Sequence, residues 1–290
     1  MKIFFVSVVL LFCFNVKYTQ NSDTINVKID TNNVSQQQKP KGLGVAVSPS
    51  SMRFNVAVGK KQVKYLYITN DTEKPYAFKI TFDNVDMDSE GKVGPANNSN
   101  YEYGLTKWIS ASPNFIELEP FEKAKVEITV NVPENEDNHH AAWCIGMVDQ
   151  VTERKTIETN ESDLMSLGVI PSFGFGVYFY QNPPDLKVNQ VEIMDFTFNY
   201  DEKNKYISLV AKNIGNGISR SKVYIELNEL KTGYYEKLDL KVFNILPGRS
   251  RNFNFVLPGT MPKGRYSIMG VLDFGSDEEV KAASKEIIIE

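Results

Sequence analysis

Hydrophobic and polar residues alternate along most of the chain from residue 43 onward. In the segments 63–70, 76–82 and 206–213, apolar or aromatic residues recur at every second position. Successive side chains of an extended chain point to opposite faces, so this period predicts β-strands with one buried face. No stretch of 10–15 residues with helical periodicity separates the segments. We therefore predict an all-β protein.

The predicted strands form two series, and Asn182-Pro183-Pro184-Asp185 lies between them. The first series comprises 45–49, 52–58, 63–70, 76–82, 108–109, 115–118, 125–132, 141–151 and 167–180, and the second 186–200, 206–213, 222–230, 238–246, 253–257, 266–274 and 280–289. Proline cannot donate to a sheet ladder, so a strand has to end at this point. Short strands between turn residues are typical of sandwiches. We predict two tandem immunoglobulin-like β-sandwich domains, 43–183 and 184–290.

One segment of the first series breaks the alternation. Residues Asp83 to Tyr103 are rich in Asp, Asn, Gly and Pro, and they predict a long insertion loop. Loops of this length are uncommon unless they are functional or disordered. A binding loop and a plainly flexible loop are both compatible with the composition, which favours flexibility.

The N-terminus predicts export. Lys2 precedes an apolar run from Ile3 to Val16, which has the length of the hydrophobic region of a signal peptide and is short for a membrane span. We predict a signal peptide at 1–20 and a polar, flexible linker at 21–42. No later run is apolar for long enough to cross a bilayer, so the mature chain is expected to have no transmembrane segment.

The cysteines are consistent with this interpretation. Only Cys13 and Cys144 are present, and Cys13 lies in the predicted signal peptide. An intramolecular disulfide is therefore not expected in the mature chain. Lipidation at Cys13 is the alternative, and bulky Phe12 before it argues against this.

Several short motifs resemble a known group of proteins. Val47-Ser48-Pro49, Gly59, the strand that ends at Asn70, Trp108-Ile109 and Ile116-Glu117-Leu118-Glu119-Pro120 resemble the first domain of PapD-like periplasmic chaperones and of WxL-interacting proteins. Asn213-x-Gly215-Asn216, Leu246-Pro247-Gly248 and Gly264-x-Tyr266 look like the domain that follows in such proteins. The likeness covers about residues 43–290. It implies a non-enzymatic, chaperone-like protein.

The same resemblance implies a binding cleft between the domains. In pilus chaperones, two basic residues on separate strands hold the C-terminal carboxylate of a subunit. Arg53 matches the first of these residues, but the second is expected near Gly176 or Val177, and neither is basic. This departure puts the carboxylate clamp and the binding of pilus subunits in doubt.

The segment 167–179 is the strongest candidate for partner binding. Its alternate positions form an apolar face and a face with small residues, which predicts either strand addition by a partner at an edge or a core strand whose glycines allow close packing. The candidate partner-binding residues are Arg53, Ile170, Ser172, Gly174, Gly176, Val177, Tyr178 and Phe179.

Catalytic and cofactor chemistry find no support in the sequence. No nucleophile motif, phosphate-binding loop or metal motif is present, so we predict no enzymatic activity, no cofactor and no metal. Adjacent residues of an extended chain point to opposite faces, and His139 and His140 could therefore hardly bind one ion. The formal net charge is −4 with no basic block, which does not favour nucleic acid as a partner.

Two functions remain open. The first is an exported protein of the bacterial periplasm or cell surface that binds another exported or outer-membrane protein by strand pairing, and assists surface or secretion-system assembly. The second is a surface adhesion or peptidoglycan-binding protein of the WxL-interacting type.

Overall fold

A computed structural model describes residues 44–96, 101–152, 172–184, 186, 190–200, 204–275 and 280–290. The predicted signal peptide, the predicted linker and most of 153–173 lie outside these residues. Residues 41–290 form one compact unit. Its described part contains β-strands and two short 3₁₀ turns, and no helix there is long and apolar enough to cross a membrane. The all-β prediction is confirmed.

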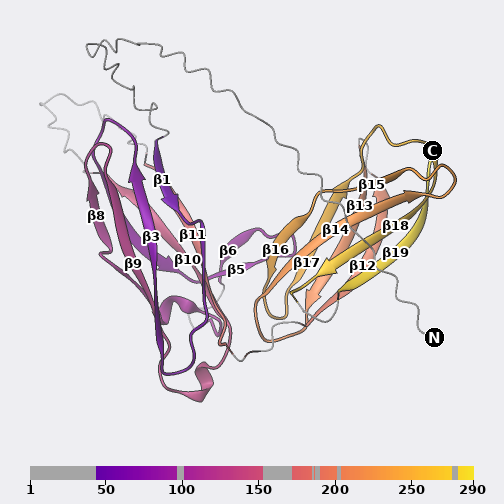
Figure 1. The fold of residues 1–290 in the computed structure, drawn as a ribbon. Helices are drawn as coiled ribbons and strands as arrows, with labels where there is room; N and C mark the ends of the chain where they lie inside the picture. The colour runs from indigo at the N-terminus through magenta and orange to yellow at the C-terminus, as the bar shows by residue number, and fades with distance from the viewer. Residues whose placement is uncertain are drawn as a thin grey trace, which may run out of the picture. The chain divides into compact units, whose positions relative to one another are not determined.

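The first sandwich consists of two facing sheets (Figure 1). One sheet has the order β1 (Val45–Ser48), β3 (Lys61–Asn70), β9 (Lys123–Asn131) and β7 (Ile109–Ser112). The other has the order β2 (Ser51–Phe54), β11 (Gly174–Gln181), β10 (Ala142–Val151), β4 (Tyr76–Asp83) and β8 (Phe115–Leu118). The chain passes from the first sheet to the second at the cis peptide Ser48–Pro49. The 3₁₀ turns η1 (Leu105–Lys107) and η2 (Glu136–Asn138) lie in the connections.

The second sandwich follows the same two-layer plan. One sheet has the order β12 (Val191–Tyr200), β13 (Lys205–Asn213) and β17 (Ser250–Val256). The other has the order β15 (Tyr235–Lys237), β14 (Ser219–Glu229), β18 (Gly264–Asp273) and β19 (Lys281–Ile289), and β16 (Lys241–Ile245) also pairs with β14. The predicted strand 238–246 is thus wrong in extent, because β15 ends before it and β16 covers only its second half.

Each sandwich has its own hydrophobic core, and the alternation in the sequence accounts for both. Inward residues of β3 and β9, such as Leu66, Ile68 and Val126, are fully buried in the first core. Ile207 and Leu209 of β13 are buried in the second. Burial of such side chains stabilises a fold by about 1.5–3 kcal/mol each.

The two sandwiches also share a buried asparagine at the end of an equivalent strand. Asn70 ends β3 and Asn213 ends β13, and both side chains are fully buried. Each accepts a hydrogen bond from the N–H two residues on, at 3.1 Å from Thr72 and 2.9 Å from Gly215. Each also donates to the carbonyl four residues on, at 2.8 Å and 2.7 Å. The ends of β3 and β13 therefore have the same local structure.

The described part of the segment 83–103 contains more regular structure than its composition predicts. Val85–Met87 (β5) and Val93–Pro95 (β6) form an antiparallel hairpin, in which Met87 faces Val93. The Asp88 side chain closes its turn by accepting hydrogen bonds from the N–H groups of Glu90 and Lys92. The prediction of a plainly flexible loop is wrong for these residues.

Candidate binding cleft

The strand β11 is paired along its whole length on one side and along half of it on the other. Its partner β10 covers Gly174 to Gln181, whereas β2 pairs only with Tyr178 to Gln181. The Tyr178 N–H donates to the Ser50 carbonyl on the β2 side. Because the direction of these groups alternates along a strand, the N–H and C=O groups of Gly174 and Gly176 point to the same side. No strand of the described residues pairs with them there.

The predicted residues of this segment divide by face. Ser172, Gly174 and Gly176 are exposed and Tyr178 is half-buried. Val177 and Phe179 point into the first core and are 1 % exposed, so their side chains are not available to a partner. Ile170 lies outside the described residues. The described part of the segment therefore has one face in the core, and β2 leaves part of one edge of β11 unpaired. Strand addition by a partner stays a prediction.

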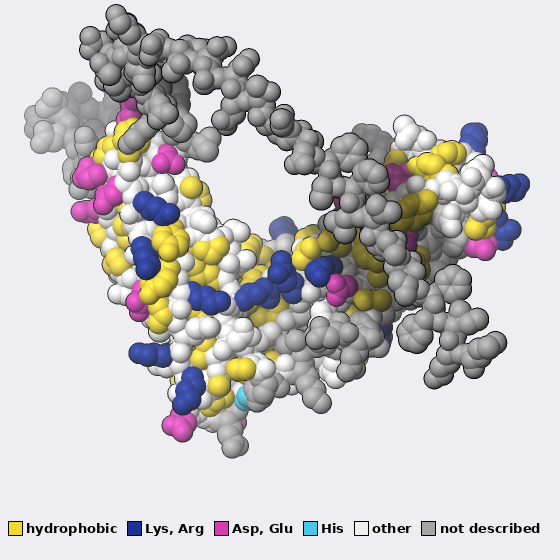
Figure 2. Space-filling view, in the orientation of Figure 1, with side chains coloured by type: hydrophobic (Ala, Val, Ile, Leu, Met, Phe, Trp, Pro, Cys, Tyr) yellow, Lys and Arg dark blue, Asp and Glu magenta, His cyan; other side chains and the backbone are white. Residues whose placement is uncertain are grey.

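A pocket of about 580 Å³ lies beside this edge, on the face that carries Tyr178 and Tyr180. Ser51 and Arg53 of β2 line it together with residues of the second sandwich. Its lining consists of Ser51, Arg53, Met87, Gly91, Tyr178, Tyr180, Arg220, Val242, Phe243, Asn244 and Arg251. Figure 2 shows Lys and Arg side chains gathered in a band across one face of the molecule.

Arg53 is the predicted site residue that this pocket contains. Its guanidinium lies 5.3 Å from the centre of the Tyr180 ring, and it donates a hydrogen bond to the Asn244 side chain. Burial, followed by the nearby charge of Arg220, holds the pKa of Arg53 below its ordinary value. Gly176 and Val177 provide no second basic group. Arg220 on β14 and Arg251 on β17 provide basic groups from the other sandwich instead.

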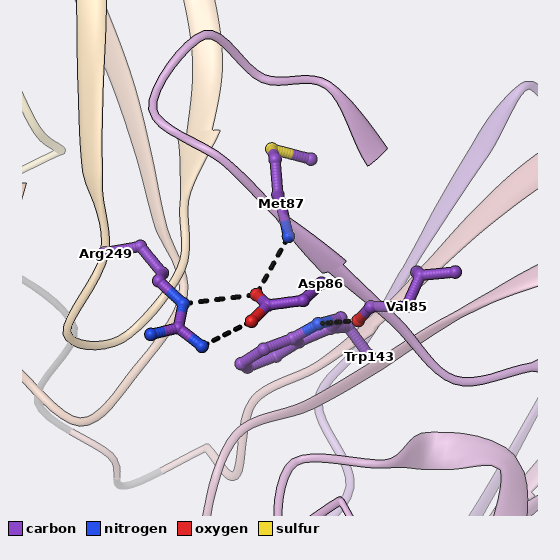
Figure 3. Close-up of polar contacts among 5 residues, drawn as sticks. All are labelled: Val85, Asp86, Met87, Trp143 and Arg249. Atoms are coloured by element: carbon purple, nitrogen blue, oxygen red, sulfur yellow. Dashed lines mark hydrogen bonds and ion pairs between the residues drawn. The ribbon is translucent and has the colours of Figure 1, made fainter. Parts of the chain in front are cut away.

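The hairpin β5–β6 forms a bridge to the second sandwich. Arg249 donates two hydrogen bonds to the Asp86 carboxylate, from Nε to Oδ1 at 3.1 Å and from Nη2 to Oδ2 (Figure 3). The Trp143 indole N–H donates to the Val85 carbonyl at 2.7 Å and holds the base of the hairpin (Figure 3). At the tip, the Ser89 carbonyl accepts the Asn252 N–H at 2.8 Å. The hairpin therefore connects the first sandwich to the start of β17.

An apolar cluster and one amide add to this connection. Ala141, Trp143, Tyr180, Leu186, Ile218 and Leu246 form a third buried cluster, with members from both sandwiches. The Asn182 side chain donates to the Ile218 carbonyl and accepts its N–H, each at 3.0 Å. Packing and paired hydrogen bonds thus join the two sandwiches beside the pocket.

Of the histidine pair, His140 lies among aromatic side chains. The His140 ring lies 5.1 Å from that of Trp108 and 6.1 Å from that of Tyr103, measured between ring centres. Within the described residues, no group of three or more His, Cys, Asp or Glu side chains could hold a metal ion.

Sequence reasoning missed Arg220, Arg251 and the hairpin. Both arginines lie on strands of the second sandwich, where a charged residue at alternate positions usually indicates a solvated face. Their position in one pocket with Arg53 follows from contacts between residues more than 150 positions apart. No local pattern carries that information.

The chain matches no protein-family model and no curated protein. Its fold is similar to the class 5 fimbriae chaperone CfaA, with 13 % identity, 84 % of this chain and 98 % of that chain covered, and a TM-score of 0.42. The CupB2 chaperone of Pseudomonas aeruginosa gives 12 % identity, 83 % and 99 % coverage, and a TM-score of 0.39. A PapD-like domain of human CEP192 is 15 % identical, with 53 % of this chain and 94 % of that chain covered and a TM-score of 0.31. The likeness is one of architecture, so function has to be inferred from the residues of this chain.

Proposed function

We propose that the protein binds an extended segment of another protein, which adds as a strand to the edge of β11 at Gly174 and Gly176. The observation that supports this most directly is the partial coverage of β11, which leaves backbone donors and acceptors beside the point where β2 begins. Unpaired edges of this kind are templates for a further strand. The function is that of a chaperone-like, protein-binding molecule of the cell envelope.

The glycines suit this role for a steric reason. Both are exposed and neither has a positive φ, so the strand is regular and presents its backbone without a covering side chain. Tyr178 and Tyr180 follow on the same face at a rise of about 3.3 Å per residue. A segment paired with Gly176 would therefore reach the pocket within a few residues, where aromatic side chains are available to its own side chains.

The proposed place of action is outside the cytoplasm. The apolar run Ile3 to Val16 after Lys2 supports export, and the partner would then be another exported or outer-membrane protein. Assistance in surface or secretion-system assembly is the finer form of this proposal. Fractionation of cells with an antibody against the chain would test the compartment.

A single substitution tests strand addition. Gly176→Pro removes the N–H that points to the open side, whereas the hydrogen bonds to β10 come from the odd-numbered residues and stay intact. Ten-residue peptides with alternating apolar and polar positions are selected on the wild-type chain by phage display, then measured by calorimetry. We expect Gly176→Pro to weaken their binding by about tenfold or more, because a hydrogen bond is lost and the ring blocks approach.

Gly176→Ala is the matched control. A Cβ at this position comes within 2.9 Å of the Ile145 Cδ1 atom, a flexible side-chain end, and the N–H is retained. We expect this variant to bind the selected peptides within about threefold of wild type. Amide exchange should slow at Gly174 and Gly176 when peptide is added. Equal binding by the proline variant, or protection confined to other strands, would refute strand addition at this edge.

A further inference from the structure

A buried guanidinium with two unpartnered nitrogens lies in the pocket. Arg251 is 5 % exposed, and its Nε and Nη1 atoms have no partner among the described residues. The guanidinium rests against Gly91, where a Cβ would come within 1.6 Å of Nη1, and lies 4.7 Å from the centre of the Phe243 ring. A buried charge without a counter-charge is unfavourable, and it attracts an anion.

The other groups around the pocket also favour an anion. Arg53 and Arg220 bring two more guanidiniums from different strands, and Ser51, Tyr178 and Tyr180 bring hydroxyl groups. No Asp or Glu side chain is among the lining residues. None of these three arginines forms an ion pair within the described part of the chain.

The nearest carboxylates belong to the hairpin and are engaged elsewhere. Asp86 pairs with Arg249, and Asp88 accepts the N–H groups of its own turn. Glu90 accepts a hydrogen bond from the Asn252 side chain. Asp88 and Glu90 raise the pKa of Arg251, but burial lowers it by more, so its charge is only partly compensated.

We propose that this pocket binds a tetrahedral oxyanion with two negative charges, a phosphate or sulfate group, through Arg251, Arg53 and Arg220. A planar carboxylate carries one charge and matches one guanidinium fork. Three guanidiniums that approach from β2, β14 and β17 suit a group with oxygens in several directions. The pocket is also larger than a single anion, so it has room for an attached organic group against Tyr178 and Phe243. Anion binding can be tested separately from strand addition, because Gly174 and Gly176 are not among the residues that line the pocket.

Calorimetry on the full chain tests the proposal with three probes, namely inorganic phosphate, glucose 6-phosphate and acetate, at constant ionic strength. We expect phosphate to bind at least tenfold more tightly than acetate. Tighter binding of glucose 6-phosphate than of phosphate would support a phosphorylated ligand, and weaker binding would support the free ion. Binding of acetate as tight as that of phosphate would overturn the proposal.

Substitutions test which arginines bind the phosphate. Arg251→Gln and Arg220→Gln should each weaken phosphate binding by about tenfold or more, since each removes a charge-assisted contact. Arg220 is exposed, so its variant keeps the test valid if the Arg251 variant does not fold. Arg265→Gln is the matched control, because Arg265 is 62 % exposed on β18 and pairs with Glu286. Unchanged phosphate affinity in Arg220→Gln would contradict the assignment.

Discussion

At the scale of single residues, two buried asparagines form the same set of side-chain hydrogen bonds, one in each sandwich. Asn70 and Asn213 end their strands, and each amide forms hydrogen bonds with an N–H and a carbonyl of the following turn. Asn213 also donates to the Ile245 carbonyl at 2.8 Å, and Asn70 to that of Glu119 at 3.0 Å. Each side chain thus connects a turn to the chain just before the strand that pairs with its own, β9 for Asn70 and β17 for Asn213. An apolar replacement would leave several buried groups without partners.

We expect Asn213→Ala to lower the free energy of unfolding by about 3 kcal/mol or more, since each orphaned buried group costs roughly 1–3 kcal/mol. Urea unfolding followed by circular dichroism measures this. Asn199→Ala is the control, because the side chain of Asn199 is half-buried and its hydrogen bond within the described residues goes to the Thr197 hydroxyl, so its loss should cost about 0.5 kcal/mol or less. An unchanged midpoint for Asn213→Ala would show that water replaces the amide.

At the scale of elements, the hairpin β5–β6 determines how one wall of the pocket is built. Its three-residue strands could not be stable alone, because a two-stranded hairpin is marginal in water. It is stabilised by Trp143 at its base, by Arg249 along β5 and by Asn252 at its tip. Gly91 has a φ of 82° and leaves the space that the Arg251 guanidinium occupies.

Gly91→Ala should therefore detach the hairpin tip. The positive φ costs about 1–2 kcal/mol for alanine, and the added Cβ overlaps Arg251. We expect faster amide exchange at Asn252, whose N–H is bound by the Ser89 carbonyl, and easier proteolysis between 88 and 92. Gly94→Ala is the matched control on the same hairpin, because no atom lies within 4 Å of its Cβ position. Equal exchange rates of the Asn252 amide in the two variants would show that Gly91 does not determine the position of the hairpin tip.

The strands differ in how far their presence can be predicted from the sequence. Strands such as β3, β10 and β13 were predictable, because their alternation reports the same burial that stabilises them. The hairpin was not, because β5 and β6 are short and rich in Asp, Gly and Pro, and their stability comes from Arg249 and Asn252 in the other sandwich. Arg53 could be proposed because its position resembles that of a basic residue in pilus chaperones. Arg220 and Arg251 could not, because they reach the pocket through contacts between the sandwiches.

At the scale of the whole unit 41–290, two cores are joined by a third. Trp143 and Tyr180 from the first sandwich pack with Leu186, Ile218 and Leu246. Apolar contacts of this kind, together with the Asn182 and Arg249 hydrogen bonds, couple the stabilities of neighbouring domains. A substitution that destabilises the second sandwich should then also lower the stability of the first.

Cys144 provides the readout for this coupling. It is 1 % exposed in the first core, and burial raises the pKa of its thiol, so the reactive thiolate is disfavoured in the folded state. In a Cys13→Ser chain, we expect Asn213→Ala to speed the labelling of Cys144 by a thiol reagent under native conditions by tenfold or more. Labelling at the wild-type rate, with the second sandwich destabilised, would mean that the sandwiches unfold independently.

The open edge of β11, at which we propose strand addition, would also accept unwanted strands. The backbone groups of Gly174 and Gly176 do not discriminate among strands, so a second copy of the chain, or a misfolded chain, competes for them with the intended partner. The glycines that admit a partner also provide no charged side chain to repel the wrong one. Selectivity must then come from beyond the ladder, from Tyr178 and the pocket beside it. Solubility at high concentration would thus depend on how often this edge is occupied.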